Sequence, residues 1–326
     1  MKNSKKLILF LFLILFTSLN LKSQVINEWT SKGNGGGGAL FSPSISPHNS
    51  NEIYLSCDMS ELFHTTDLGA SWNNTDFREI TGNNGSAVQF TNNPLILYCI
   101  NFENDLRTPN KSTDGGITWS PLASDPTFGE AYSLFCDPNN SNNILISDYT
   151  NLYYSSNAGI TFNLKFTIAG GCYIGGVLFD GVNIYAGTNS GLLVSTNSGS
   201  TFSISTLTGI PATEAIVSFA GAKQSGVTRF FCVTLGSGDV YPGVTGADHY
   251  SYKNIYSIDV GQASWSLRTT GINSTHHPFF ISMSLNNISV VYTGGGSNAG
   301  EPVVYKSING GISWSSILIT NNNQNV

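Results

Sequence analysis

Two carboxylates and a few aromatic side chains are the residues of this sequence whose types and spacing could do chemistry on a ligand. Asp58 follows the apolar run Ile53–Cys57, and Glu61 lies three residues further along the chain. A carboxylate at a strand end can act as a general base, and a neighbouring carboxyl can contact or protonate the substrate. Asp58 could equally be a strand-end Asp that caps a turn, and a carboxylate in the position of Glu61 is usually just solvated. Asp58 is therefore a candidate catalytic residue and Glu61 a candidate substrate-binding residue, with the structural interpretation left open for both.

Aromatic residues near these carboxylates or in glycine-rich stretches could stack on a ligand. Trp29 lies close to the N-terminus, and Tyr241 and Tyr250 lie in a long Gly-rich insertion that could form a loop over a site. Tyrosines in loops also simply pack, so both readings stay open. The adjacent His276 and His277 would point to opposite faces of a strand, which favours a loop decoration over a metal site.

The glycine run Gly33–Gly38 could suggest a phosphate-binding loop, but no Lys follows it and no helix is expected there. Nothing else in the sequence has the spacing of a ligand cluster. We therefore expect neither a cofactor nor a metal.

The N-terminal segment is typical of an export signal. Residues 1–23 contain a basic start, the apolar run Leu7–Phe16 and a polar end, and cleavage is expected between Ser23 and Gln24. The apolar run is about half of the roughly 20 residues that a membrane-spanning helix needs. We expect a secreted or cell-surface protein without a membrane span, whose oligomeric state the sequence does not reveal.

Charge and cysteine content narrow the class of partner. After removal of residues 1–23, which hold four lysines and no acid, 10 basic and 20 acidic residues remain, a net charge of −10. Such a protein is a poor partner for phosphate backbones, so nucleic-acid binding is not expected. The five cysteines are odd in number, form no CxxC pair and mostly lie in apolar runs, which favours buried thiols over disulfides or metal ligands.

The element that must position any site is an internal repeat. The octet Ser/Thr-x-Asp/Asn-x-Gly-x-Ser/Thr-Trp/Phe starts at Thr65, Ser112, Ser155, Ser195 and Ser307, and a looser copy with one insertion starts at Ser257. Successive starts are 47, 43, 40, 62 and 50 residues apart. Asp or Asn can accept hydrogen bonds from the turn's own amides, Gly supplies an uncommon backbone angle, and short apolar strands precede the copies. The pattern predicts hairpin turns in an all-β protein built from repeated four-stranded blades.

The octets resemble the Asp-box (BNR) repeats of β-propellers, and the resemblance covers essentially all of residues 24–326. At about 45 residues per blade, it implies one propeller domain of six to seven blades, which either closes near Val326 or forms the N-terminal half of a longer protein. The resemblance also places each box at the outer rim, between the third and fourth strands of a blade. Its Asp and Asn residues are then structural, namely Asp67, Asp114, Asn157, Asn197, Asp259 and Asn309.

The N-terminal stretch resembles the start of the two-propeller xyloglucanases, a glycoside hydrolase family. The matching features are Trp29, the run Gly35–Gly38, the segment Pro43–Pro47 and the strand Ile53–Cys57 that leads to Asp58. The resemblance implies that Asp58 is the general base of an inverting hydrolysis. The sequence departs from the family in having Met59-Ser60-Glu61 after the Asp, where an apolar residue and two glycines are usual, and in its length of one propeller.

The function that follows is a secreted propeller that acts on or binds β-glucan polysaccharide. Inverting hydrolysis needs a second carboxyl about 6.5–9.5 Å from the first, which would come from this chain, another subunit or further sequence. The alternative is a non-catalytic, sortilin-like propeller that binds a surface protein or a glycan. A sialidase is not expected, because the Arg-Ile-Pro start of that family is absent and only four arginines are present.

Overall fold

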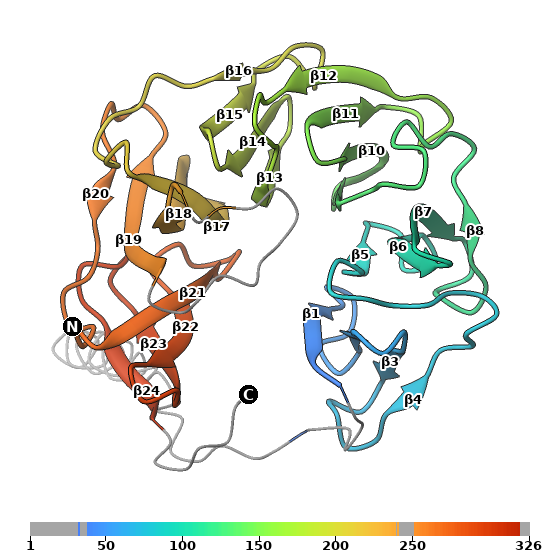
Figure 1. The fold of residues 1–326 in the computed structure, drawn as a ribbon, viewed down its shortest axis with the longest axis horizontal. Coiled ribbons are helices and arrows are strands. Elements are labelled where there is room, and N and C mark those ends of the chain that lie inside the picture. The colour runs from blue at the N-terminus through green and yellow to red at the C-terminus, as the bar shows by residue number, and fades with distance from the viewer. Residues whose placement is uncertain (1–31, 33–37, 239, 241–250, 320–326) are drawn as a thin grey trace, which may run out of the picture. The chain divides into compact units, whose positions relative to one another are not determined.

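The computed structural model describes Lys32, residues 38–238, Val240 and residues 251–319. The described residues form six four-stranded antiparallel sheets, each made of four consecutive strands. Figure 1 shows that the sheets are the blades of a propeller, with the first strand of each blade nearest the centre and the fourth at the outer rim. The prediction of a propeller is thus confirmed, with the lower of the two expected blade numbers.

The strands follow one another from the centre outward in every blade. Blades 1 to 3 contain β1 (Leu40–Ile45), β2 (Ile53–Cys57), β3 (Leu62–Thr65), β4 (Asn73–Asn74), β5 (Gln89–Phe90), β6 (Leu97–Glu103), β7 (Leu106–Ser112), β8 (Ser120–Pro121), β9 (Ser133–Asp137), β10 (Asn140–Ser147), β11 (Asn151–Ser155) and β12 (Asn163–Thr167). Blades 4 to 6 contain β13 (Ile174–Asp180), β14 (Asn183–Thr188), β15 (Gly191–Ser195), β16 (Ser203–Ile204), β17 (Glu214–Gln224), β18 (Val227–Gly236), β19 (Tyr252–Asp259), β20 (Ser266–Leu267), β21 (His276–Met283), β22 (Val291–Ser297), β23 (Pro302–Ser307) and β24 (Ser315–Ile319).

The second strand of a blade is apolar on both sides because it packs against two neighbouring blades. In β10, Ile144 and Ile146 belong to the hydrophobic cluster shared with blade 2, whereas Leu145 belongs to the cluster shared with blade 4. In β18, Phe231 and Val233 pack toward blade 6 and Cys232 packs toward blade 4. Successive side chains of a strand point to opposite faces, so an unbroken apolar run is what a strand between two packed interfaces requires.

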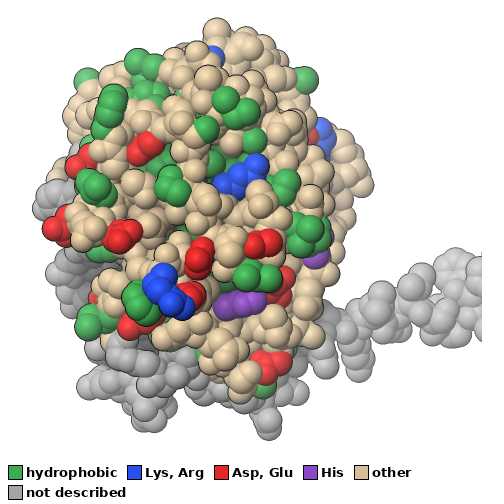
Figure 2. Space-filling view, turned by 90° about the vertical axis from the view of Figure 1, so that its right-hand side faces the viewer, with side chains coloured by type: hydrophobic (Ala, Val, Ile, Leu, Met, Phe, Trp, Pro, Cys, Tyr) green, Lys and Arg blue, Asp and Glu red, His purple; other side chains and the backbone are tan. Residues whose placement is uncertain are grey.

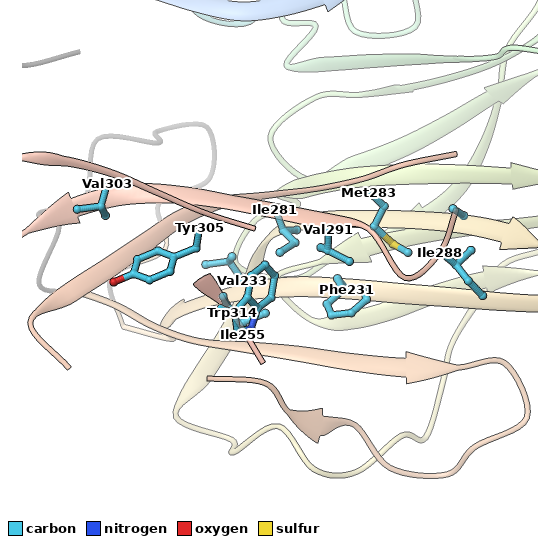
Figure 3. Close-up of a cluster of buried hydrophobic side chains, with 11 residues drawn as sticks. Phe231, Val233, Ile255, Ile281, Met283, Ile288, Val291, Val303, Tyr305 and Trp314 are labelled. Carbon is cyan, nitrogen blue, oxygen red and sulfur yellow. The ribbon is translucent and has the colours of Figure 1, made fainter. Parts of the chain in front are cut away.

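Five hydrophobic clusters join successive blades, from blades 1 and 2 to blades 5 and 6. Figure 3 shows the last of them, in which Phe231, Val233 and Ile255 of blade 5 pack against side chains of blade 6. Among the described residues, no cluster of this kind joins blade 6 to blade 1. The core is therefore a series of interfaces between blades, with the polar boxes outside it.

Each octet forms the turn between the third and fourth strands of its blade, as predicted. In the first box, the Thr65 hydroxyl donates to Asp67 Oδ1 at 2.7 Å and accepts from the Gly69 N–H at 3.0 Å. The Ser71 N–H and hydroxyl donate to the two Asp67 oxygens at 2.9 and 2.7 Å. The boxes of Asp114, Asn157, Asn197 and Asn309 repeat these contacts. In the three Asn boxes, the side-chain amide donates to the Ser or Thr hydroxyl that corresponds to Ser71, instead of accepting from it. These polar residues are structural.

The looser copy in blade 5 replaces the box contacts with an ion pair. Arg229 of β18 donates from Nε to Asp259 Oδ1 at 2.6 Å and from Nη2 to Oδ2 at 2.9 Å. Arg268 Nε donates to the Ser257 hydroxyl at 2.8 Å. Asp259 is thus structural, as expected, but it is held by a neighbouring strand because the inserted residue changes the spacing of its own turn.

All five cysteines are buried, as predicted. Burial raises the pKa of the Cys99, Cys136 and Cys172 thiols to about 12. They act as small apolar side chains in the blade interfaces. The described residues also contain no helix long and apolar enough to span a membrane.

Candidate functional site

The outer rim offers no single charged or apolar surface on the side that carries β4 and β8. Figure 2 shows acidic, basic and hydrophobic side chains scattered there among polar ones. One face of the propeller carries the hairpins between the second and third strands of the blades, together with the starts of the first strands. We call this the hairpin face, and Asp58 lies on it, between β2 and β3.

Asp58 is held at the start of β1 by two hydrogen bonds. Its N–H donates to the Ala39 carbonyl at 3.2 Å, and its Oδ1 accepts from the Ala39 N–H at 2.8 Å. The side chain is exposed, and the hydrogen bonds that it makes with described residues reach Oδ1. One oxygen of this exposed carboxylate is therefore fixed, which is an arrangement that suits a base acting on water.

The last residue of the glycine run packs directly on this carboxylate. Gly38 has φ = +87°, and a Cβ at this position would lie 2.6 Å from Asp58 Oδ1 and 2.8 Å from Cys57 Sγ. Only glycine allows both the backbone angle and the close approach. Gly38 and Asp58, which the sequence placed in one motif, are thus in contact.

Glu61 lies at the other side of the same hairpin. Its carbonyl accepts the Cys57 N–H at 2.9 Å, and its Oε2 is a buried oxygen that has no hydrogen-bond partner among the described residues. Burial raises the pKa of the Cys57 thiol, and the Glu61 and Asp58 carboxylates add to the shift because both lie close to it. The hairpin therefore brings the two predicted carboxylates around one thiol. Trp29, Tyr241 and Tyr250, predicted to bind substrate, lie outside the described residues.

A second group on the hairpin face was not identified from the sequence. The Arg107 guanidinium lies 5.3 Å from the centre of the Tyr132 ring and donates to the Tyr149 hydroxyl at 3.0 Å. The Tyr132 and Tyr149 rings are 5.2 Å apart. Tyr132 and Tyr173 immediately precede the first strands of blades 3 and 4. A tyrosine recurring at this point of two successive blades is the signal that could have identified them.

The two histidines occupy the cleft between blades 5 and 6, which has a volume of about 480 Å³. His276 Nδ1 is 2.7 Å from the Tyr305 hydroxyl, and His277 Nε2 is 2.7 Å from Asn298 Oδ1. Burial lowers the pKa of His276, although Glu301 opposes the shift. Groups of three or more metal-ligating side chains are absent from the described part of the chain.

The four arginines do not come together into the carboxylate clamp of a sialidase. Arg78 pairs with Asp76 in the exposed segment after β4, and Arg107 lies on the hairpin face. Arg229 and Arg268 are bound to the turn that begins at Ser257 in blade 5.

Comparison with known proteins supports the fold. A family model for the BNR/Asp-box repeat matches residues 111–121. No curated protein matches the sequence significantly. Among solved structures, an ancestral GH74 enzyme has a TM-score of 0.67 at 18% identity and covers 90% of this chain and 40% of its own. The GH74 enzyme of Niastella koreensis has a TM-score of 0.66 at 19% identity, covering 87% of this chain and 46% of its own.

Another solved structure with a similar fold is YCF48 bound to D1 peptide, with a TM-score of 0.59 and 14% identity, covering 87% of this chain and 82% of its own. This chain spans less than half the length of either GH74 enzyme. The resemblance to the two-propeller hydrolases is confirmed at the level of the propeller fold.

Proposed function

We propose that this protein is an exported propeller of the glycoside hydrolase type, which binds β-glucan polysaccharide on the hairpin face and uses Asp58 as a general base. The arrangement of Asp58 carries this proposal: the Ala39 N–H fixes Oδ1, Gly38 packs on it, and the side chain is exposed. The fold likeness to two GH74 enzymes supports the same conclusion.

In an inverting hydrolysis, Asp58 would take a proton from the attacking water while a second carboxyl gives a proton to the leaving oxygen. Glu61 is the carboxyl of this chain that shares the Cys57 environment with Asp58. Its buried Oε2 has no hydrogen-bond partner in the described part of the chain, so a substrate oxygen could supply one. A carboxyl outside this propeller is the other source, because each GH74 neighbour is more than twice as long as the matched region.

The test is a reducing-end assay of residues 24–326 on xyloglucan and related β-glucans. Asp58→Asn should abolish release of reducing ends, whereas Asp76→Asn, which changes a carboxylate beyond β4, should leave it unchanged. Loss of activity in Glu61→Gln as well would identify the acid within this chain. Release that survives Asp58→Asn would overturn the assignment of the base.

A non-catalytic binding propeller is the second candidate. It is favoured by the fold likeness to YCF48, which matches this chain along most of both lengths and whose structure holds a bound peptide. Affinity electrophoresis in gels containing xyloglucan distinguishes the candidates. Retardation without hydrolysis would indicate a glycan-binding module, and no retardation of the folded protein would favour a protein partner.

A further inference from the structure

A cavity of about 330 Å³ lies between the innermost parts of blades 1 to 4, apart from Asp58 and Glu61. Its walls include Phe41, Gln89, Tyr132, Phe135 and Tyr173, and none of the described residues that line it carries a charge. Ligand pockets have volumes of roughly 300–1,000 Å³ and combine apolar or aromatic walls with a few polar groups. This cavity is at the small end of that range and has that kind of lining.

Tyr132 is fixed in place before any ligand arrives. The Arg107 guanidinium lies 5.3 Å from its ring centre, and the ring of Tyr149 lies 5.2 Å away. Arg107 is itself held by its hydrogen bond to the Tyr149 hydroxyl. Among the described residues, no hydrogen bond uses the Tyr132 hydroxyl, which leaves it available to a ligand. A rigid aromatic wall lowers the entropy cost of binding.

Tyr173 completes the polar part of the wall. Its N–H donates to Asn189 Oδ1 at 2.9 Å, and Asn189 donates to the Gly171 carbonyl at 3.0 Å, so its backbone is anchored. Burial raises the pKa of Tyr173, and the nearby Tyr252 and Tyr132 phenols add to the shift. Burial likewise raises the pKa of Tyr132. The Tyr132 and Tyr173 hydroxyls therefore stay protonated, so each can both donate and accept hydrogen bonds.

We propose that this axial cavity binds a single neutral pyranose ring, with Tyr132 and Tyr173 as hydrogen-bonding residues, Phe41 and Phe135 as apolar walls and Arg107 as a positioning residue for Tyr132. A pyranose presents both apolar ring faces and hydroxyl groups, and each buried hydroxyl needs a partner. The uncharged lining disfavours an ionic ligand, and the volume favours one ring over a chain. The proposal does not depend on hydrolysis or on Asp58.

The experiment is titration calorimetry and saturation-transfer NMR of the full protein with methyl β-D-glucopyranoside, with glycerol as a polyol that lacks a ring. Saturable binding of the glucoside and none of glycerol is expected. Tyr132→Phe and Tyr173→Phe should each weaken binding about 2- to 10-fold, the loss expected for one hydrogen bond. Tyr292→Phe is the matched control, because Tyr292 lies beneath Lys306 in blade 6 and does not line the cavity.

Arg107→Met tests the positioning role, and it should weaken glucoside binding. The Tyr→Phe variants should keep the wild-type unfolding midpoint, which shows that their weaker binding does not come from loss of the fold. No saturable binding to the wild-type protein, or equal binding by Tyr132→Phe, Tyr173→Phe and Tyr292→Phe, would overturn the proposal. A protein that binds the glucoside but does not act on β-glucan would retain this site and lose only the proposed hydrolytic function.

Discussion

Replacing Gly38 by alanine tests the link between the glycine run and Asp58. The alanine methyl would enter space that Asp58 Oδ1, Met59 Cγ and Cys57 Sγ now occupy, at 2.6, 2.5 and 2.8 Å. The carboxylate would have to move, which breaks its hydrogen bond from the Ala39 N–H. The backbone at φ = +87° adds strain of its own.

The two costs can be separated with a second glycine. A non-glycine residue in the left-handed region costs roughly 1–2 kcal/mol, and losing a hydrogen bond to a charged group costs about 1.5–3 kcal/mol, less where water replaces it. Gly38→Ala should therefore destabilise by about 2–4 kcal/mol. Gly226 has φ = +81° and open space where a Cβ would be, so Gly226→Ala should cost only the strain, about 1–2 kcal/mol.

Urea unfolding of both variants measures the free energies, and the reducing-end assay measures the site. Gly38→Ala should lose activity at a urea concentration at which it is still folded, whereas Gly226→Ala should keep it. Equal destabilisation in the two variants with equal activity would refute the inference that Gly38 holds Asp58 in position.

Four further results are expected. Hydrogen bonds from Ser71 and Thr118 lower the pKa of Asp67 and Asp114 to about 2, below the roughly 3.9 of an unfolded Asp. The contribution of these two carboxylates to the stability of the folded state is therefore present above about pH 4 and is lost as the pH falls toward 2. Asp67→Asn with Asp114→Asn should therefore flatten the fall in melting temperature over that range, and parallel curves would contradict this. Arg229→Met should destabilise by about 1–3 kcal/mol, and a double-mutant cycle with Asp259→Asn should show coupling between the two partly buried groups; additive effects would count against the ion pair. Phe231→Ala removes a fully buried ring between blades 5 and 6 and should lower the free energy of unfolding in urea by about 3–5 kcal/mol. A loss smaller than that of a surface substitution would contradict the packing of this ring. A thiol reagent should label none of the five cysteines in the native protein and all of them in guanidinium, and rapid native labelling would show that the interfaces are open.

The local features could be predicted from sequence because their causes are local. The octet contains both the donors and the acceptors of its own hydrogen bonds, which is why its turn could be predicted. The turn, its place before the fourth strand and the structural role of its Asp or Asn are confirmed. The ion pair of the blade 5 turn could not be predicted, because Arg229 lies 30 residues before Asp259 and reaches it only across paired strands.

The site was predicted only in part, for the same reason. Asp58 and Glu61 share one hairpin, so their proximity follows from the sequence, and their catalytic and binding roles stay predictions. The contact of Gly38 with Asp58 depends on a backbone angle that the sequence does not specify. The ring stacking of Arg107 with Tyr132 joins blades 2 and 3, and no repeat within one blade indicates it.

The series of five hydrophobic clusters gives the described blades the energetics of a linear stack. Stability in such an array is a sum of nearest-neighbour interfaces, and blades 3 and 4 each take part in two clusters, whereas blades 1 and 6 each take part in one. Among the described contacts, blades that take part in two clusters should therefore resist local opening more than a blade that takes part in one. Amide hydrogens of β2 and β22 would then exchange faster than those of β10 and β14. Asp58 and Glu61 belong to a blade with one described cluster, so their alignment depends on fewer of these interfaces than that of a side chain in blade 3 or 4.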